Sequence, residues 1–486
     1  MKVSAVVLAL ALLLPFTLVI APTSPPSNSV IIVGAGMSGG FMAAKTLEEA
    51  GYKDFIILEA SSRVGGRLHK GNIGGHTIEL GANWVNSGGP KSSPSLQIAK
   101  KIKLKTFYSD YANLTSNIYK QDGGLYQKHV VESAVRIAKT RDAFCTNLSK
   151  ILSSETTRDD DTSILGSQRL LKEVPMTPLE MAIDYFFNDY EDAEPPRITS
   201  LKTTYPRNQL VDFGEDSYFV ADPRGFESVV HSVAKQFLSH GHQVIRDPRL
   251  KLNKVVRNIS YSKDKVTVKT EDGSVYQANY AIVSVSIGVL QSDFIEFTPN
   301  LPLWKKLAIN NFNMAIYTKI FMKFPYKFWP TGPGTEFFIY AHERRGYFPI
   351  WQHLENEMPG SNILFVTVTD EESRRVERQS DEKTKAEIMN NVLRKLFGNK
   401  IPEPQSIFVP RWWSNRFFNG SYSNWPNGFT QQSYKELKEP IGPIYFTGEH
   451  TNSTYLGYID GAYFAGINTA NDLIKCFKQF SDGHHI

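Results

Sequence analysis

A glycine-rich turn near the N-terminus holds the residues with the clearest chemistry. Gly34, Gly36 and Gly39 follow the apolar run Val30–Val33, and a second apolar run ends in Glu59, 20 residues after Gly39. Gly34 permits a tight turn, Gly36 lets backbone approach a pyrophosphate, and Gly39 lets a helix pack closely on the strand. Anions bind at such a helix N-terminus, and Glu59 is placed to accept hydrogen bonds from ribose hydroxyls. The spacing predicts a dinucleotide site.

A second loop of similar chemistry follows the second apolar run. Arg63 and Arg67 flank the pair Gly65-Gly66. Guanidinium groups make paired hydrogen bonds with pyrophosphate oxygens. The loop therefore predicts a second phosphate contact and favours a flavin dinucleotide over a nicotinamide one. A solvated surface loop is the alternative interpretation.

A third motif lies near the C-terminus. The short apolar run 444–446 leads into Thr447-Gly448-Glu449-His450-Thr451, and a helix is expected from about Gly461 to Lys475. The N-terminus of that helix can face the flavin, where its dipole stabilises negative charge. Glu449 is expected to hydrogen-bond the ribityl chain of the flavin. A simple strand–helix connection is the alternative.

Lys319 is the candidate catalytic residue. It lies in Ile316–Phe321, whose β-branched and aromatic residues predict a strand. Alternation places Tyr317, Lys319 and Phe321 on one face. A solvent-exposed lysine on an edge strand is the alternative for this residue.

The elements that must position these residues fall into two kinds of segment. Residues 244–283 contain apolar strands and the hairpin turn 271–274, whereas residues 108–220 are helix-prone, charged and aromatic. Residues 300–435 combine strands such as 363–368 with a charged helix expected over 370–397. The sequence predicts an α/β fold in which a Rossmann-like FAD-binding domain is interleaved with an α+β substrate-binding domain. The FAD-binding domain is assigned to residues 30–107, 221–299 and 436–476, and the substrate-binding domain to 108–220 and 300–435.

The first residues do not belong to either domain. Residues 1–21 are apolar apart from Lys2 and predict a secretory signal peptide, and residues 22–29 form a Pro/Ser-rich linker. An uncleaved membrane anchor is the alternative; otherwise no membrane contact is expected after cleavage. Five glycosylation acceptors agree with secretion to the extracellular space: Asn113, Asn147, Asn258, Asn419 and Asn452.

Composition excludes several classes of protein. The 486 residues carry a formal net charge of +5 without an Arg-rich stripe, so a nucleic-acid partner is not expected, although an acidic cell-wall polysaccharide is a possible one. Only Cys145 and Cys476 occur, so a thiolate metal cluster is excluded and no metal is expected. Whether the two cysteines form a disulfide is left open, as is the oligomeric state.

Taken together, these motifs resemble those of the FAD-dependent amine oxidases and, more closely, of the plant extracellular polyamine oxidases. The resemblance covers roughly residues 29–475. It rests on the glycine fingerprint with Arg-x-Gly-Gly-Arg, on Glu79–Trp84, and on the Gly-Glu-His-Thr motif at 448–451. Further matching segments are 194–196, 317–319, 411–413 and 423–426.

The resemblance implies a reaction and roles for several residues. A hydride would pass from a carbon next to a secondary amine of spermidine or spermine to flavin N5. Water would then hydrolyse the imine to an aminoaldehyde and 1,3-diaminopropane, and O₂ would be reduced to H₂O₂. Lys319 would hold a water against flavin N5. The implied substrate contacts are Tyr317, Tyr422, Tyr458 and Glu191, and the implied cofactor contacts include Arg67, Trp84, Val256, Trp412 and Glu449. FAD is expected to be non-covalent, because the only C-terminal cysteine, Cys476, lies beyond the flavin motif.

Three positions depart from the family pattern. Asn86 stands where the pattern has a catalytic-site glutamate beside the reacting amine, and Asp192 stands where it has an aromatic residue. Asn86 cannot supply a carboxylate, whereas Asp192 is expected to supply a new one at a different place and is counted among the substrate contacts. Tyr422 replaces a phenylalanine. These changes leave the preferred polyamine, the oxidised carbon and the rate open. A flavin amine or amino-acid oxidase with another substrate, and a slow polyamine-binding flavoprotein, remain alternatives.

Overall fold

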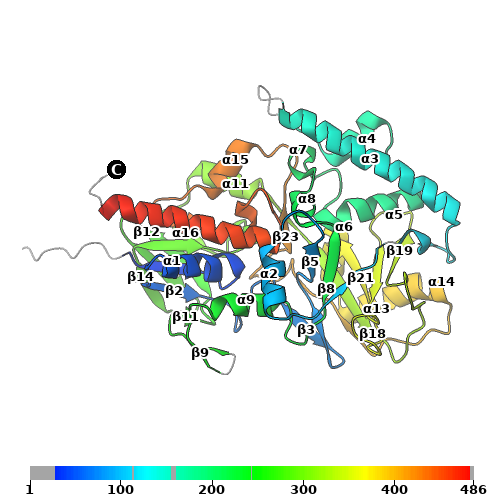
Figure 1. The fold of residues 1–486 in the computed structure, drawn as a ribbon, viewed down its shortest axis with the longest axis horizontal. Helices are drawn as coiled ribbons and strands as arrows, with labels where there is room; N and C mark the ends of the chain where they lie inside the picture. Colours follow the sequence, from blue (N-terminus) through cyan, green and yellow to red (C-terminus); the bar gives the residue numbers. More distant parts are fainter. Residues whose placement is uncertain (1–27, 112–113, 155–159, 242–243, 482–486) are drawn as a thin grey trace, which may run out of the picture.

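The structure, a computed structural model, describes residues 28–111, 114–154, 160–241 and 244–481. The predicted signal peptide, most of the linker and the acceptor Asn113 lie outside these ranges. Two lobes lie side by side: α16 (Ile459–Ser481) crosses one of them, and α3 (Lys128–Ser154) lies along the edge of the other (Figure 1).

The first lobe is built on a parallel sheet of five strands in the order β11-β2-β1-β15-β24. Alternate residues of β1 serve different cores: Val30 and Ile32 face one, whereas Ile31 and Val33 face the other. Burial on both faces explains why the strands read as continuous apolar runs, as predicted. The strands are β1 (Val30–Val33), β2 (Phe55–Leu58), β11 (Leu250–Lys251), β15 (Tyr280–Val283) and β24 (Ile444–Phe446).

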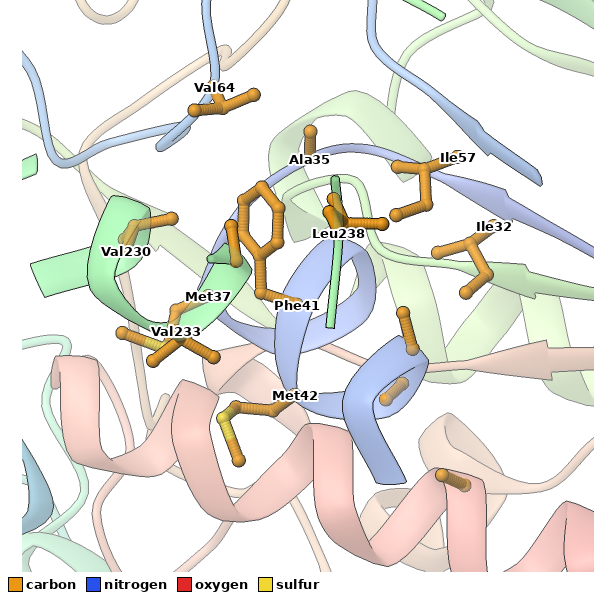
Figure 2. Packing of buried hydrophobic residues seen from close by; sticks show 14 of the residues in the cluster. Ile32, Ala35, Met37, Phe41, Met42, Ile57, Val64, Val230, Val233 and Leu238 are labelled. Carbon is orange, nitrogen blue, oxygen red and sulfur yellow. The ribbon is translucent and has the colours of Figure 1, made fainter. Parts of the chain in front are cut away.

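Helices cover one face of this sheet. The glycine-rich turn leads into the π-helical segment η1 (Met37–Ala43) and then α1 (Ala44–Glu49), which pack beside α9 (Glu227–Ala234) and α16. Figure 2 shows Phe41 and Met37 beside Val230 and Val233 of α9, and Met42 pointing toward α16. The predicted C-terminal helix is confirmed, but it begins at Ile459 and ends at Ser481.

A mixed sheet packs on the opposite face, in the order β14-β13-β12-β16; its first three strands are antiparallel and β16 runs parallel to β12. The predicted hairpin is confirmed, because β13 pairs with β14 around residues 271–274. The elements here are β12 (Val256–Tyr261), β13 (Val266–Thr270), β14 (Val275–Ala278), β16 (Glu296–Thr298), α10 (Ile287–Leu290), α11 (Leu303–Asn310) and α15 (Gln431–Lys438). The short strands β9 (His240–Gly241) and β10 (Val244–Ile245) pair beside this lobe.

The second lobe contains a six-stranded sheet in the order β22-β18-β21-β20-β19-β7. Its strands are β7 (Ile118–Lys120), β18 (Tyr317–Lys323), β19 (Phe337–Ala341), β20 (Ile350–His353), β21 (Ile363–Thr369) and β22 (Ser406–Phe408). The helices around it are η2 (Leu114–Ser116), α3, α4 (Ile164–Leu171), α5 (Pro178–Phe187), α6 (Asp189–Asp192), α7 (Leu201–Thr204) and α8 (Asn208–Phe213).

The prediction of a single helix over residues 370–397 is wrong. The segment divides into α12 (Asp370–Glu377), α13 (Asp381–Ile388), the π-helical η3 (Met389–Leu393) and α14 (Arg394–Phe397). The break occurs because the Ser380 side chain accepts a hydrogen bond from the Lys383 backbone N–H and so caps a new helix.

Smaller sheets join the two lobes. β5 (Trp84–Ser87), β8 (Asp216–Val220) and β6 (Thr106–Tyr108) form one, and β3 (Lys70–Ile73) pairs with β4 (His76–Glu79) in another. β17 (Asn313–Ala315) pairs with β23 (Tyr422–Asn424), while α2 (Pro94–Lys101) and η4 (Glu449–Thr451) lie beside α16. The proposed domain ranges stay a prediction. The β5–β8 pairing brings strands from both predicted domains into one sheet.

Candidate functional site

A cavity of about 410 Å³ is lined by residues of both lobes. Fourteen of the sixteen site residues predicted from the sequence lie on its wall, and Gly39 and Lys319 lie behind it. The fourteen are Gly34, Gly36, Glu59, Arg67, Trp84, Asn86, Glu191, Asp192, Val256, Tyr317, Trp412, Tyr422, Glu449 and Tyr458. Segments far apart in the sequence therefore meet at one concave surface, as a binding site requires.

The three glycines of the turn have different surroundings. Gly34 has a φ of +105°, which only glycine adopts readily. An added Cβ at Gly39 would lie 2.2 Å from Ser284 Cβ, so Gly39 allows η1 to reach the end of β15, where its N–H donates to Ser284 Oγ at 2.9 Å. At Gly36 an added Cβ would have no protein atom within 4 Å. Gly36 therefore opens the wall toward the cavity.

Arg63 does not serve the phosphate contact predicted for it. Its guanidinium donates to the carbonyls of Val64, Gly66 and Leu68 and so holds its own loop together. Arg63 does not line the cavity, whereas Gly65, Gly66 and Arg67 do. Burial lowers the pKa of Arg63, opposed by Glu227 and Glu59. The two-arginine prediction is thus wrong for Arg63, because the turn needs a donor for its inward-pointing carbonyls.

Arg67 and Glu449 connect the two glycine motifs. Arg67 Nη1 donates to Glu449 Oε1 at 2.6 Å and to the Ser421 carbonyl at 3.1 Å. Glu449 also accepts from the N–H and hydroxyl of Ser423 and from the Gly457 N–H. Burial opposes the charge, but Arg67, His450 and Ser423 together keep the pKa of Glu449 below its usual value. Each carboxylate oxygen already accepts two hydrogen bonds, so we expect Glu449 to organise the site more than to bind the ribityl chain.

Glu59 keeps more capacity for a ligand. One carboxylate oxygen accepts from the Ala35 N–H at 2.8 Å, and the other accepts from the N–H and hydroxyl of Ser61. The first of these bonds ties the end of β2 to the glycine turn. Since Glu59 also lines the cavity, the predicted ribose contact fits its position.

Lys319 is fully buried, which overturns the alternative of a solvated edge-strand lysine. β18 is paired on both sides, by β21 and β22, and Lys319 is 1% exposed. Its ammonium donates to the Gly81 carbonyl at 2.6 Å and to Asn83 Oδ1 at 2.7 Å. Burial lowers the pKa of Lys319, and the opposing charge of Glu79 only partly counters this.

The predicted alternation along β18 is confirmed. Phe321 and half-buried Tyr317 belong to the clusters on one face, whereas Ile320 and Met322 belong to the cluster on the other. Lys319 lies between the first two in sequence and directs its ammonium to the 81–83 segment at the cavity wall.

Aromatic rings form a row along the cavity. The ring centroids of Trp84 and Tyr190 are 6.2 Å apart, those of Tyr190 and Tyr317 are 5.8 Å apart, and those of Tyr317 and Tyr422 are 6.1 Å apart. Burial raises the pKa of the Tyr317 and Tyr422 phenols, so both stay neutral. Such faces suit an alkylamine, whose chain is apolar and whose cation is attracted by the ring quadrupole.

Glu191 lies at the tyrosine end of this row. Its Oε1 accepts from the Tyr458 hydroxyl, and its backbone carbonyl accepts from the Tyr422 hydroxyl at 2.7 Å. Burial raises the pKa of Glu191, and this is opposed by Arg207 and by the Tyr458 hydrogen bond. Tyr458 thus orients the carboxylate and Tyr422 fixes the backbone of the same residue, which makes Glu191 a suitable partner for a substrate ammonium.

Asp192 is not the free carboxylate that the sequence suggested. Arg207 donates to both of its oxygens, from Nε at 3.2 Å and from Nη2 at 2.7 Å. Asp192 remains on the cavity wall, but as half of an ion pair. Asn86, on β5 opposite Ser217 of β8, also lines the cavity and is half-buried and uncharged.

The cavity suits a flavin dinucleotide at its glycine-rich end. Gly36 leaves space for a pyrophosphate, and Gly66, Glu59 and the start of η1 surround that space. Asn83 lines the cavity and has a buried Nδ2 that lacks a partner among the described residues, so it can donate to a bound cofactor.

The two cysteines lie elsewhere and do not pair with each other. Cys145 contacts Ser167 Oγ at 2.9 Å, and Cys476 contacts the Tyr280 hydroxyl at 3.9 Å. The cavity wall formed by the described residues includes neither of them. Over the same ranges of the chain, no group of three or more His, Cys, Asp or Glu side chains is arranged to hold a metal ion, and no helix is long and apolar enough to cross a bilayer.

Sequence reasoning missed several contributors. Arg207, Ser284 and Tyr190 line the cavity but belong to no motif. Gly466 was missed as well: an added Cβ there would lie 2.3 Å from the Ser38 carbonyl, so it allows α16 to approach η1. The four-residue spacing of Ala462, Gly466 and Ala470 on the predicted helix was the available signal for that contact.

Comparisons with known proteins agree with this geometry. Residues 38–474 match the sequence model of the flavin containing amine oxidoreductase family. Polyamine oxidase 1 of Zea mays is 52% identical over 465 residues, which cover 94% of this chain and 92% of that protein. Polyamine oxidase 6 of Oryza sativa subsp. japonica is 53% identical over 479 residues, or 97% of this chain and 95% of that protein.

A solved structure of putrescine oxidase bound to putrescine has the same fold. Its TM-score is 0.71 at 21% sequence identity, and the match covers 92% of this chain and 99% of that one. The predicted fold, an FAD-binding unit combined with a substrate-binding unit, is confirmed by this likeness and by the family match. The chain therefore belongs to the flavin-containing amine oxidoreductase family and is an FAD-dependent oxidoreductase.

Proposed function

We propose that this protein is a polyamine oxidase that acts on spermidine and spermine at a carbon next to the secondary amine. The observation that carries the proposal is the row of aromatic rings from Trp84 to Tyr422, which ends at the half-buried Glu191. Two relatives at 52% and 53% identity bear the name polyamine oxidase. An apolar aromatic path that leads to a carboxylate suits an alkyl chain that carries a distal ammonium.

The reacting nitrogen must lose its proton before oxidation. Bound FAD would supply a two-electron acceptor for the hydride of the neighbouring carbon, with O₂ as the final oxidant and H₂O₂ as its product. Only a neutral amine has the lone pair that drives this step, and neutralising an alkylamine of pKa near ~10 at pH 7 costs about 4 kcal/mol. Tyr317 and Tyr422 lower that cost by removing the amine from water.

Other residues fix the position of the substrate along the cavity and supply a hydrogen-bond donor near the reacting atoms. Glu191 would bind an ammonium at one end of the substrate, which fixes the position of the reacting carbon. Gly81 and Asn83 accept two hydrogen bonds from the Lys319 ammonium, and a third N–H can reach a water at the cavity wall. Trp84, Val256 and Trp412 would pack against the bound cofactor, and Arg67 and Glu449 would fix the loops around it.

The products and the location are part of the proposal. Oxidation at the inner carbon would release an aminoaldehyde and 1,3-diaminopropane, and FAD would be held non-covalently. We place the enzyme outside the cell, on the strength of the predicted signal peptide and the glycosylation acceptors. Among the acceptors, Asn147 is exposed on α3, whereas the side-chain Oδ1 of Asn452 accepts from the Thr454 and Tyr455 N–H groups and Asn452 is only half-exposed. A net positive charge would allow association with acidic cell-wall polysaccharide.

Anaerobic titration tests the function directly. Spermidine, and separately spermine, added without O₂ to the purified yellow protein should bleach its absorbance near the flavin maximum within seconds. Admission of air should restore the colour and release H₂O₂. Chromatography of the products should find 1,3-diaminopropane and not putrescine from spermidine. A spectrum that stays oxidised with both amines, but bleaches with a monoamine or an amino acid, would contradict the proposal.

The charge missing at position 86 gives a second prediction. Asn86→Glu places a carboxylate on the cavity wall, where it should hold a substrate ammonium and raise kcat/KM for spermidine about tenfold. Asn86→Gln is the matched control, because it has the same length without the charge. Steady-state kinetics on spermidine, spermine and an N-acetylated polyamine measure the effect. Identical kinetics of the Glu and Gln variants on all three amines would show that position 86 does not contact the substrate.

A further inference from the structure

Arg207 introduces a cation into a cavity that should bind cations. Its guanidinium pairs with Asp192, and the two side chains are only 12% and 8% exposed. Both residues line the cavity beside Glu191, which also acts electrostatically on Arg207. None of the glycine motifs or family segments in the sequence includes Arg207, so only the folded structure shows that it lines the cavity.

The pair changes the charge of the substrate end of the cavity. The charged side chains on the wall fall into two groups: Glu59, Arg67, Lys254 and Glu449 lie near the glycine motifs, whereas Glu191, Asp192 and Arg207 lie near Tyr422 and Tyr458. In the second group Arg207 offsets Asp192, which leaves the single negative charge of Glu191. Asn86 adds none.

We propose that Arg207 is a specificity-determining residue that neutralises Asp192, so that this end of the cavity accepts the arm of an amine that bears one ammonium and discriminates against an arm that bears two. The inference rests on the proposed function, since it names the class of amine that the same site prefers. An arm with two closely spaced ammoniums would leave one of them beside Arg207 without a carboxylate of its own. Like charges held close together in a buried site oppose binding strongly.

A purely structural role for Arg207 predicts a different behaviour. Arg207 Nη2 also donates to the Phe187 carbonyl at 3.3 Å, and the guanidinium lies 4.8 Å from the centre of the Tyr205 ring. If the Arg207 side chain only held α6 in place through Phe187 and Tyr205, its loss would weaken the binding of all amines by the same factor. A charge effect would instead change the ratio between singly and doubly charged ligands.

The test measures that ratio by isothermal titration of the FAD-loaded enzyme with two probes. Propylamine presents one ammonium, and 1,3-diaminopropane presents two at close spacing. Arg207→Gln leaves a net charge of −2 at this end, from Glu191 and Asp192. The ratio of the diamine affinity to the monoamine affinity should therefore rise about tenfold. Asp192→Asn leaves Arg207 unpaired, so the preference should fall by a similar factor.

The double variant Asp192→Asn/Arg207→Gln is the matched control. It restores a single negative charge without the ion pair, so its preference should return to within threefold of the wild-type value even if both probes bind more weakly. A ratio that stays constant in all four proteins would overturn the inference. If neither probe binds the wild-type enzyme and no polyamine bleaches its flavin, the proposed function itself fails, which is a distinguishable result.

Discussion

Lys319→Met should lower kcat with spermidine by at least about 100-fold while the purified protein keeps its FAD and its fold. Lys319 is the buried cation behind the cavity wall, and its ammonium is aimed at the 81–83 segment by hydrogen bonds to Gly81 and Asn83. Methionine fills a similar volume, so packing beside the Trp84 ring, whose centre lies 6.0 Å from the ammonium, should survive. The acceptors on Gly81 and Asn83 would lose their donor, at a cost of about 1–3 kcal/mol each.

The pH dependence separates a chemical role from a structural one. Burial lowers the pKa of Lys319, and the negative charge of Glu79 partly counters this; burial also raises the pKa of Glu79, so the two groups titrate together. Glu79→Gln removes that charge but keeps an acceptor for the Phe226 N–H, so the pKa of Lys319 should fall further. In a plot of kcat against pH, the change that reflects the titration of Lys319 should therefore move to lower pH in Glu79→Gln and be absent in Lys319→Met. Stopped-flow traces of flavin bleaching and of reoxidation by O₂ would locate the affected step.

A rate within threefold of wild type in Lys319→Met would contradict the prediction, provided that absorbance shows full flavin occupancy. Lys319→Arg serves as the conservative control. It keeps a cation but cannot reproduce the compact ammonium between Gly81 and Asn83, so an intermediate rate is expected. If Lys319→Arg were as slow as Lys319→Met, a positive charge alone would not be sufficient, and the ammonium would have to lie between Gly81 and Asn83 for catalysis.

The cofactor half of the site was largely predictable because it depends on local sequence. A buried parallel strand reads as an apolar run, a tight turn requires glycine at Gly34, and a helix must follow it closely at Gly39. Each of these rules acts within a few residues of the chain, so spacing alone reveals them. Arg63 shows what spacing cannot predict. Its residue type and position suit a phosphate contact, but its guanidinium donates to the carbonyls of its own loop.

The substrate half could not be assembled from the sequence without the family resemblance. Tyr317, Glu191 and Tyr458 come together only because the two lobes close around them. The pairing of Asp192 with Arg207 depends on how α6 and α8 are placed, which no local pattern records. A carboxylate that reads as a new substrate contact therefore becomes half of an ion pair.

Gly39→Ala and Gly36→Ala should both abolish tight FAD binding, but for different reasons. At Gly39 the new methyl would lie 2.2 Å from Ser284 Cβ, so η1 must move away from β15 and lose the hydrogen bond to Ser284 Oγ. Such overpacking typically costs about 1–3 kcal/mol, and here it also displaces the turn that holds the pyrophosphate. At Gly36 the methyl meets no protein atom within 4 Å, so it would only occupy space that the cofactor needs.

The two variants should therefore differ in stability when flavin is absent. Gly36→Ala should unfold within about 0.5 kcal/mol of the wild-type apoprotein, because φ at Gly36 is −92° and alanine adopts it without strain. Gly39→Ala should be less stable both with and without flavin, and Ser284→Gly in the same chain should restore part of the stability and of the flavin content by removing the clashing Cβ. Flavin absorbance and thermal unfolding with increasing FAD measure both quantities. If Gly36→Ala retained its FAD at the wild-type affinity, the pyrophosphate could not lie against this glycine, and the position of the cofactor inferred from the fingerprint would be wrong.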